Sequence, residues 1–197
     1  MAVADQRGNA FIKSTFVSKD AAAAKPLRLT TFNIAKTANE LINEPYGWGG
    51  LYQNRDCSAM LKDLFAPFGL WLPRHSDDQA KEGGIFIDFE KLSPQEKEAM
   101  ILKRGIPYLT LIWRRGHIML YIGSYQGSVL VFHNMWGVRT KDMLGRETRK
   151  IVGHAAITTL HPGIEFQDSD NPEKGYLDGI LGMTLLVNPN NRETSEQ

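Results

Sequence analysis

The chain carries, at residues 46–58, the sequence Tyr46-Gly-Trp-Gly-Gly-Leu-Tyr-Gln-Asn-Arg-Asp-Cys57-Ser58. A glycine-rich aromatic loop leads into Asp56, a residue type that is favoured as a helix N-cap. The apolar residues that follow repeat at the i, i+3, i+4, i+7, i+8 spacing of one buried helix face. They are Cys57, Met60, Leu61, Leu64 and Phe65. The spacing predicts a helix with the only cysteine of the chain in its first turn, facing the interior.

The position of Cys57 gives it a candidate chemistry. The helix dipole and the free N–H groups of a first turn favour a thiolate over a thiol. A thiolate is a nucleophile if a base can reach it. A lone cysteine on an apolar helix face is more often a small buried hydrophobe, so the catalytic interpretation depends on a partner elsewhere in the chain.

Two histidines in predicted β-hairpins are the candidate partners of Cys57. Three β-rich runs are separated by turns that contain glycine, and they lie at residues 108–113, 117–122 and 128–133. Side chains alternate along a strand, so His117 and His133 each lie on one face of their run. If Gly123 and Gly127 flank the turn symmetrically, the two histidines are directly opposed, with Cβ atoms about 4.5–5.5 Å apart. One histidine would take the thiol proton, and the other would orient the first histidine. Taken alone, each histidine is typical of an ordinary residue at the end of a strand.

The composition predicts a soluble globular domain and excludes several function classes. The 197 residues are 42% hydrophobic and 23% charged, with a net charge of +1, which argues against nucleic acid or an anionic membrane surface as a partner. No apolar run reaches the roughly 18 residues of a transmembrane helix. No Cys-x-x-Cys or His-x-x-x-His pair is present, so we expect no metal and no other cofactor. The first residues lack the basic and apolar regions of a signal peptide, which favours either a cytoplasmic protein or an export segment outside this chain.

The predicted helices precede most of the predicted strands, which indicates an α+β fold with N-terminal helices packed on an antiparallel β-sheet. We expect an N-terminal strand and linker at residues 1–28, the main domain at 29–187 and a polar tail at 188–197. Local signals predict a strand at 9–18, a helix capped by Asn33 and ended by Pro45, a loop at 72–84, a helix from the Ser93–Glu96 capping box to Gly105, an acidic loop at 163–174 and a terminal strand within 177–187.

Five motifs in this order resemble those of the NlpC/P60 cysteine peptidases, in the branch that carries bacterial SH3-like domains upstream. They are Pro45-Tyr-Gly-Trp-Gly-Gly50, Asp56-Cys-Ser58, Leu72-Pro-Arg-His-Ser76, Gly116-His-Ile-Met-Leu-Tyr-Ile-Gly123 and Val131-Phe-His-Asn-Met-Trp-Gly137. The resemblance spans residues 29–187 and implies a papain-like fold. It also implies that residues 1–28 are a remnant of an SH3-like domain.

The resemblance further implies an activity and a site. Cys57 would be the nucleophile, His117 the base and His133 the residue that orients the base. The reaction would be hydrolysis of peptidoglycan stem peptides, through a thioester, at the bond between γ-D-glutamate and the diamino acid. The residues that would hold the L-Ala-γ-D-Glu unit are Tyr46, Trp48, Asp56, Ser58 and Ser76. With an export signal outside this chain, such an enzyme would work in the cell envelope.

Four questions stay open at the level of sequence. A thioester can also be resolved by an amine or an alcohol, which would make the protein an acyltransferase or amidase. A catalytically silent module that binds the cell wall is a further alternative. Asp56 cannot easily both cap a helix and bind a substrate ammonium, and without full SH3-like domains the pocket would admit longer, cross-linked peptides.

Overall fold

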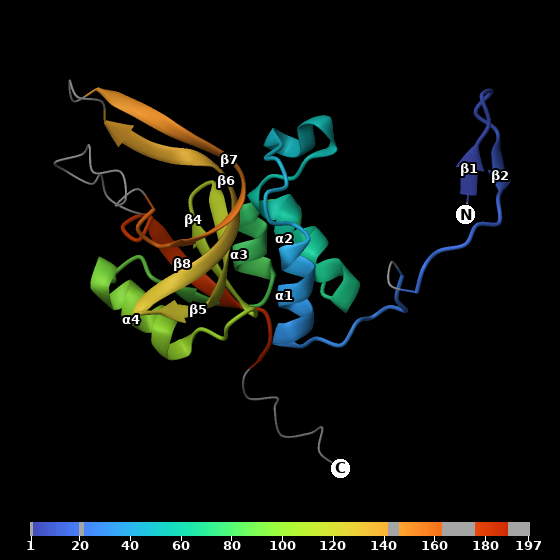
Figure 1. The fold of residues 1–197 in the computed structure, drawn as a ribbon. Helices are drawn as coiled ribbons and strands as arrows, with labels where there is room; N and C mark the ends of the chain where they lie inside the picture. Colours follow the sequence, from blue (N-terminus) through green and yellow to red (C-terminus); the bar gives the residue numbers. More distant parts are fainter. Residues whose placement is uncertain (1, 20–21, 142–145, 163–175, 189–197) are drawn as a thin grey trace, which may run out of the picture.

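The computed structural model describes residues 2–19, 22–141, 146–162 and 176–188, and its centre is a six-stranded antiparallel sheet of order β3-β8-β4-β5-β6-β7 (Figure 1). The strands are β3 (Ile85–Asp88), β4 (Thr110–Arg114), β5 (His117–Tyr125), β6 (Ser128–Lys141), β7 (Glu147–Thr159) and β8 (Ile180–Leu185). The helices are α1 (Thr31–Asn39), α2 (Cys57–Phe65), α3 (Ser76–Glu82) and α4 (Pro94–Arg104), with 3₁₀ turns η1 (Trp48–Gln53) and η2 (Ala66–Phe68). The predicted α+β class with an antiparallel sheet is confirmed.

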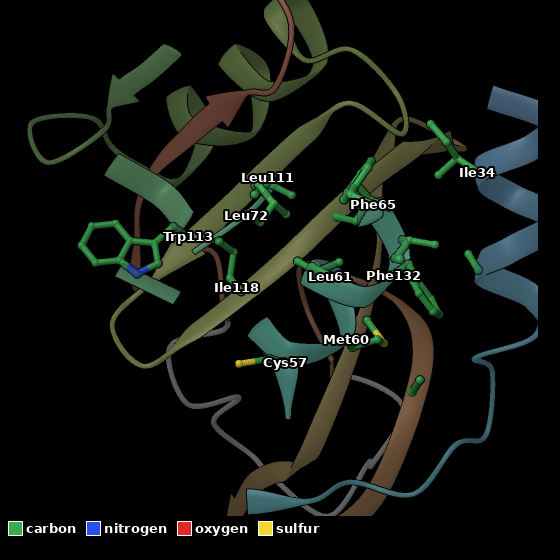
Figure 2. Close-up of a cluster of buried hydrophobic side chains, with 14 of the residues drawn as sticks. Ile34, Cys57, Met60, Leu61, Phe65, Leu72, Leu111, Trp113, Ile118 and Phe132 are labelled. Atoms are coloured by element: carbon green, nitrogen blue, oxygen red, sulfur yellow. The ribbon is translucent and has the colours of Figure 1, made fainter. Parts of the chain in front are cut away.

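Helix α2 forms as its sequence predicts and lies in the larger of two apolar clusters. The Asp56 side chain caps it by accepting the Ala59 N–H at 2.9 Å. All five residues of the predicted apolar face are buried. They pack against α1 and against one face of the sheet, with Cys57 at the margin of the cluster (Figure 2). The thiol therefore lies at the edge of the apolar core, in the first turn of α2.

The central strands β8, β4, β5 and β6 are buried on both faces of the sheet, because their side chains alternate between the two clusters. Along β5, Ile118 and Leu120 pack with α2, whereas Met119 and Tyr121 pack in the second cluster with Ile101 of α4. By the same alternation the two site histidines belong to the second face. His117 lies at the start of β5, and His133 lies within β6.

The hairpin between β5 and β6 differs from the prediction in its register. A tight turn at Gln126 and Gly127 joins the strands, with positive φ at both residues (49° and 83°), as a type I′ turn requires. The register then shifts between Tyr121 and Gly123, where a β-bulge adds one residue to β5. Beyond the bulge Leu120 pairs with Phe132, so direct opposition of the two histidines is wrong. The offset is two residues, and both histidines stay on one face.

Three other local predictions are also corrected. Thr30, not Asn33, caps α1 by accepting the Asn33 N–H at 3.2 Å, and the helix ends at Asn39, well before Pro45. Residues 72–84 are not a loop throughout, because α3 begins at Ser76. This short helix buries only Gln79 and Ala80, so its sequence has no apolar periodicity to detect. The helix from Pro94 to Arg104, with its Ser93–Glu96 capping box, is confirmed, as is the terminal strand within 177–187.

The N-terminal residues form a small hairpin that lies apart from the sheet (Figure 1). Here β1 (Ala2–Ala4) pairs with β2 (Ala10–Ile12), so the strand is shorter than the predicted 9–18. The proposed division of the chain into three parts stays a prediction. The acidic loop at 163–174, and the tail beyond residue 188, lie outside the described residues. Among the helices of the described ranges, none combines the length and apolar character needed to span a bilayer.

Candidate active site

His117 and His133 are in direct contact across two neighbouring strands. His117 opens β5 and His133 lies within β6, and His117 Nε2 is 2.8 Å from His133 Nδ1. The rings meet edge to face, with centroids 5.1 Å apart and an interplanar angle of 66°. Diagonal neighbours on one sheet face are within reach of aromatic side chains. The two-residue offset therefore preserves the contact that the sequence predicts.

Cys57 reaches the same end of β5 from the first turn of α2. Its side chain is buried, and its thiol lies against the backbone N–H of Ile118, the residue after His117. Tyr176 covers the histidine pair, with ring centroids 5.6 Å from His117 and 5.8 Å from His133. A negative charge on the Cys57 sulfur would raise the pKa of Tyr176, although burial is the larger cause of its raised pKa. The thiol, the two imidazoles and the phenol form one cluster.

Burial favours the uncharged form of each group in this cluster. Burial, with the Asp56 carboxylate acting in the same direction, raises the pKa of the Cys57 thiol. Burial and the guanidinium of Arg114 lower the pKa of His117 to about 3. Burial and the neighbouring His117 lower the pKa of His133 well below its usual value. Burial thus opposes the thiolate that the helix N-terminus favours.

Asp56 is engaged by three partners within the protein. Besides the hydrogen bond from the Ala59 N–H, it accepts one from each terminal guanidinium nitrogen of Arg74. Nη1 donates to Oδ1 at 3.0 Å, and Nη2 donates to Oδ2 at 2.7 Å. The Ser58 hydroxyl donates to Asp56 Oδ1 at 3.2 Å and accepts from Arg74 Nη1 at 3.1 Å. Burial alone would raise the pKa of Asp56, but Arg74 and the Ala59 N–H hold it below its usual range. Arg74 had no role in the sequence analysis, although it lies in the motif that contains Ser76.

The cap can be separated from the ion pair by two substitutions at Asp56. Asparagine caps helices as well as aspartate does, and alanine does not. Because both replacements remove the ion pair with Arg74, we expect Asp56→Ala to unfold with a free energy about 1 kcal/mol lower than Asp56→Asn. Urea denaturation of the two variants measures this difference. Equal free energies of unfolding would mean that the hydrogen bond from the Ala59 N–H to residue 56 does not stabilise the protein.

The aromatic loop is held beside Cys57 by backbone contacts. The Tyr46 N–H donates to the Gly153 carbonyl at 2.8 Å, and the Gly47 N–H donates to the Arg55 carbonyl at 2.9 Å. A Cβ at Gly47 would lie 2.5 Å from Asn54 Cβ, so only glycine fits. The Tyr46 hydroxyl lies against the backbone N–H of Cys57, and burial is the main cause that raises the pKa of Tyr46.

Tyr46 and Trp48 form an aromatic wall together with Trp136, a residue that the sequence analysis did not assign. The ring centroids are 5.1 Å apart for Tyr46–Trp48, 6.1 Å for Tyr46–Trp136 and 6.0 Å for Trp48–Trp136. A second register shift, between β6 and β7, brackets Trp136. One residue of β6 separates Met135 from Gly137, whereas two residues of β7 separate their partners His154 and Ile151. Bulges of this kind redirect side chains. Trp48 keeps 57% of its surface exposed, so the wall faces solvent.

Of the predicted substrate-binding residues, Ser76 has the weakest structural connection to the rest of the site. It begins α3, and its hydroxyl donates to Asp77 Oδ1 at 3.2 Å. The same helix is nevertheless fastened to the start of α2, because the buried Gln79 amide donates to the carbonyls of Ser58 and Pro73, both at 2.8 Å. The segment that carries Arg74 is therefore fixed against the cysteine helix.

The chain belongs to the NlpC/P60 family, whose model matches residues 43–152, more than half of the sequence. This range includes the cysteine, both histidines and the aromatic loop. Among curated proteins, none matches the chain. The family assignment and the fold that it implies agree with the geometry described above.

Solved structures similar to this chain carry the same family name. One, described as a novel NlpC/P60 endopeptidase from Photobacterium damselae subsp. piscicida, is 29% identical over 94% of this chain and 45% of its own, with a TM-score of 0.79. An NlpC/P60 family protein from Bacillus cereus ATCC 10987 is 18% identical over 83% of this chain and 42% of its own, with a TM-score of 0.50. The second likeness concerns the fold alone. The chain spans less than half the length of either protein.

Proposed function

We propose that the protein is a cysteine endopeptidase that hydrolyses peptidoglycan stem peptides between γ-D-glutamate and the diamino acid. Membership of the NlpC/P60 family and the similarity to an endopeptidase support a cell-wall peptidase. The observation that carries the proposal is the 2.8 Å contact between His117 and His133 beside a buried Cys57. A nucleophile, a base and a residue that orients the base are the parts that acyl transfer needs.

In the proposed mechanism, His117 accepts the Cys57 proton on Nδ1, because its Nε2 is engaged by His133. The sulfur attacks the γ-carbonyl carbon of D-glutamate, and the negative charge moves to the carbonyl oxygen. The Cys57 backbone N–H, with the Tyr46 hydroxyl beside it, would stabilise that oxyanion.

The tetrahedral intermediate collapses to a thioester when the C–N bond breaks, and His117 donates its proton to the leaving amine of the diamino acid. Water then attacks the thioester and gives its proton to His117. The C–S bond breaks, the γ-carboxylate of D-glutamate leaves, and the proton returns to the sulfur. Because the resting pair is neutral, charge develops only during these steps, while His133 stabilises the imidazolium.

The proposed substrate wall consists of Tyr46, Trp48, Asp56 and Ser58, with Ser76 on the far side. Asp56 would attract the free amino end of L-Ala. Its ion pair with Arg74 reduces the negative charge that it can offer. We therefore infer a modest preference for a free amino end rather than an absolute requirement.

Mass spectrometry of two L-Ala-γ-D-Glu-diaminopimelate peptides, one with a free and one with a blocked amino end, tests the proposal. We expect wild-type protein to release the diamino acid from both and to act faster on the free peptide. The Cys57→Ala variant, checked by circular dichroism, should release none. Cleavage by Cys57→Ala, or none by folded wild type, would contradict the proposal. A product joined to an added amine, with no hydrolysis, would indicate an acyltransferase instead.

A further inference from the structure

The second ring nitrogen of His133 meets a threonine on the next strand. His133 Nε2 lies 3.0 Å from Thr158 Oγ1, and Thr158 lies in β7, the edge strand beside β6. The Thr158 hydroxyl is also 2.7 Å from the Thr159 backbone carbonyl. His117, His133 and Thr158 therefore form a continuous row of contacts across three neighbouring strands.

The order of the protons along this row follows from the single proton of a hydroxyl. A backbone carbonyl can only accept, so at 2.7 Å the Thr158 hydroxyl donates to Thr159. With its proton committed, Thr158 Oγ1 accepts from His133, and His133 carries its proton on Nε2. A neutral imidazole has one donor and one acceptor nitrogen, so His133 Nδ1 is bare.

The same reasoning gives the tautomer of His117. Because His133 Nδ1 is bare, the 2.8 Å contact requires His117 Nε2 to donate. His117 then also has its single proton on Nε2, and its Nδ1 is free to accept a proton. In the opposite arrangement His117 would present an N–H on Nδ1 and could not act as a base.

We propose that Thr158 is a positioning residue that fixes the tautomers of both histidines, so that His117 Nδ1 is kept as the proton acceptor. The expected effect on catalysis rests on the proposed function. The tautomers themselves exist in the free protein and are measured without substrate. The His133 ring is fully buried, so water cannot readily replace a lost partner.

Long-range proton–nitrogen NMR spectra of the full chain, labelled with nitrogen-15 in histidine, test the proposal directly. Single histidine variants assign the signals of the five rings. At neutral pH we expect His117 and His133 to carry their protons on Nε2 in wild type. Thr158→Ser should keep this pattern, and Thr158→Val should lose it. Protonation of His133 on Nδ1 in wild type, or an unchanged pattern in Thr158→Val, would overturn the proposal.

The matched control is Thr37→Val. The Thr37 hydroxyl likewise donates to a backbone carbonyl, that of Asn33 at 3.0 Å, but in α1 and without a histidine. We expect Thr158→Val to lower kcat by about 10- to 100-fold with little change in KM, the range found for groups that orient metal-bound histidines. Thr158→Ser should restore kcat, and Thr37→Val should leave it unchanged.

The two proposals fail in different ways. If wild-type protein cleaves no stem peptide, the proposed function fails, while the tautomers in the spectra still decide the role of Thr158. If the peptide is cleaved but Thr158→Val keeps wild-type kcat, the positioning role is overturned and the peptidase proposal stands.

Discussion

Replacement of His117 by alanine is expected to lower kcat/KM by about 10³- to 10⁴-fold, the upper part of the range for removal of a general base. The thiol that it serves is neutral at rest, because burial raises the pKa of Cys57. Without His117, no group in the cluster takes the proton as the C–S bond forms. Initial rates on the free L-Ala-γ-D-Glu-diaminopimelate peptide measure the loss.

The control for this variant is His161→Ala. His161 lies 3.6 Å from Glu98 rather than in the cluster, and its removal should leave the rate unchanged. A His117→Ala protein that keeps its fold and a tenth or more of wild-type activity would show that another group deprotonates the thiol.

The alkylation rate of Cys57 by iodoacetamide is expected to rise by about 100-fold from pH 6 to pH 8. Only the thiolate reacts, and below the pKa of a thiol the thiolate fraction rises about tenfold per pH unit. Burial raises the pKa of Cys57, and burial and Arg114 lower the pKa of His117 to about 3, so both shifts favour the neutral pair at neutral pH. Mass spectrometry of the alkylated protein over time gives the rate.

A thiolate–imidazolium ion pair at rest predicts a different result. The rate would then be nearly constant between pH 6 and pH 8, since the thiolate would already be formed. Asp56→Asn offers a matched variant, because the Asp56 carboxylate raises the pKa of Cys57. Its profile should move toward lower pH, whereas an unchanged profile would mean that the carboxylate charge does not reach the sulfur.

The sequence predicted those parts of the site that depend on local pattern. The cap at Asp56 and the buried face of α2 follow from residue type and helical spacing, which act within a few residues. The shared face of His117 and His133 follows from alternation along strands. The register of the two strands could not be predicted in this way, because it depends on the bulge in β5. The one sequence signal at the bulge is a glycine, Gly123, whose φ is 128°.

Partners that come from distant segments could not be predicted from one sequence. Arg74 meets Asp56 across 18 residues of chain, and Thr158 meets His133 across 25. Trp136 lies at a register shift between β6 and β7, where two residues of β7 oppose it. Each of these side chains is of a common type in an ordinary context, and its role arises from tertiary contacts alone.

The bulge in β5 also limits which changes in chain length this protein can tolerate. Between the turn and the bulge, paired positions such as Tyr125 and Ser128 sum to an odd number, and beyond the bulge the sum is even. Deletion of the added residue would remove the bulge but leave the pairs beyond it, such as Tyr121 with Val131, unchanged, so His117 would stay on the face of His133. One residue inserted between the bulge and His117 would instead turn His117 to the opposite side of the sheet from His133. Homologous chains are therefore expected to tolerate a single deletion at the bulge, whereas a single insertion between the bulge and His117 should be absent from active members.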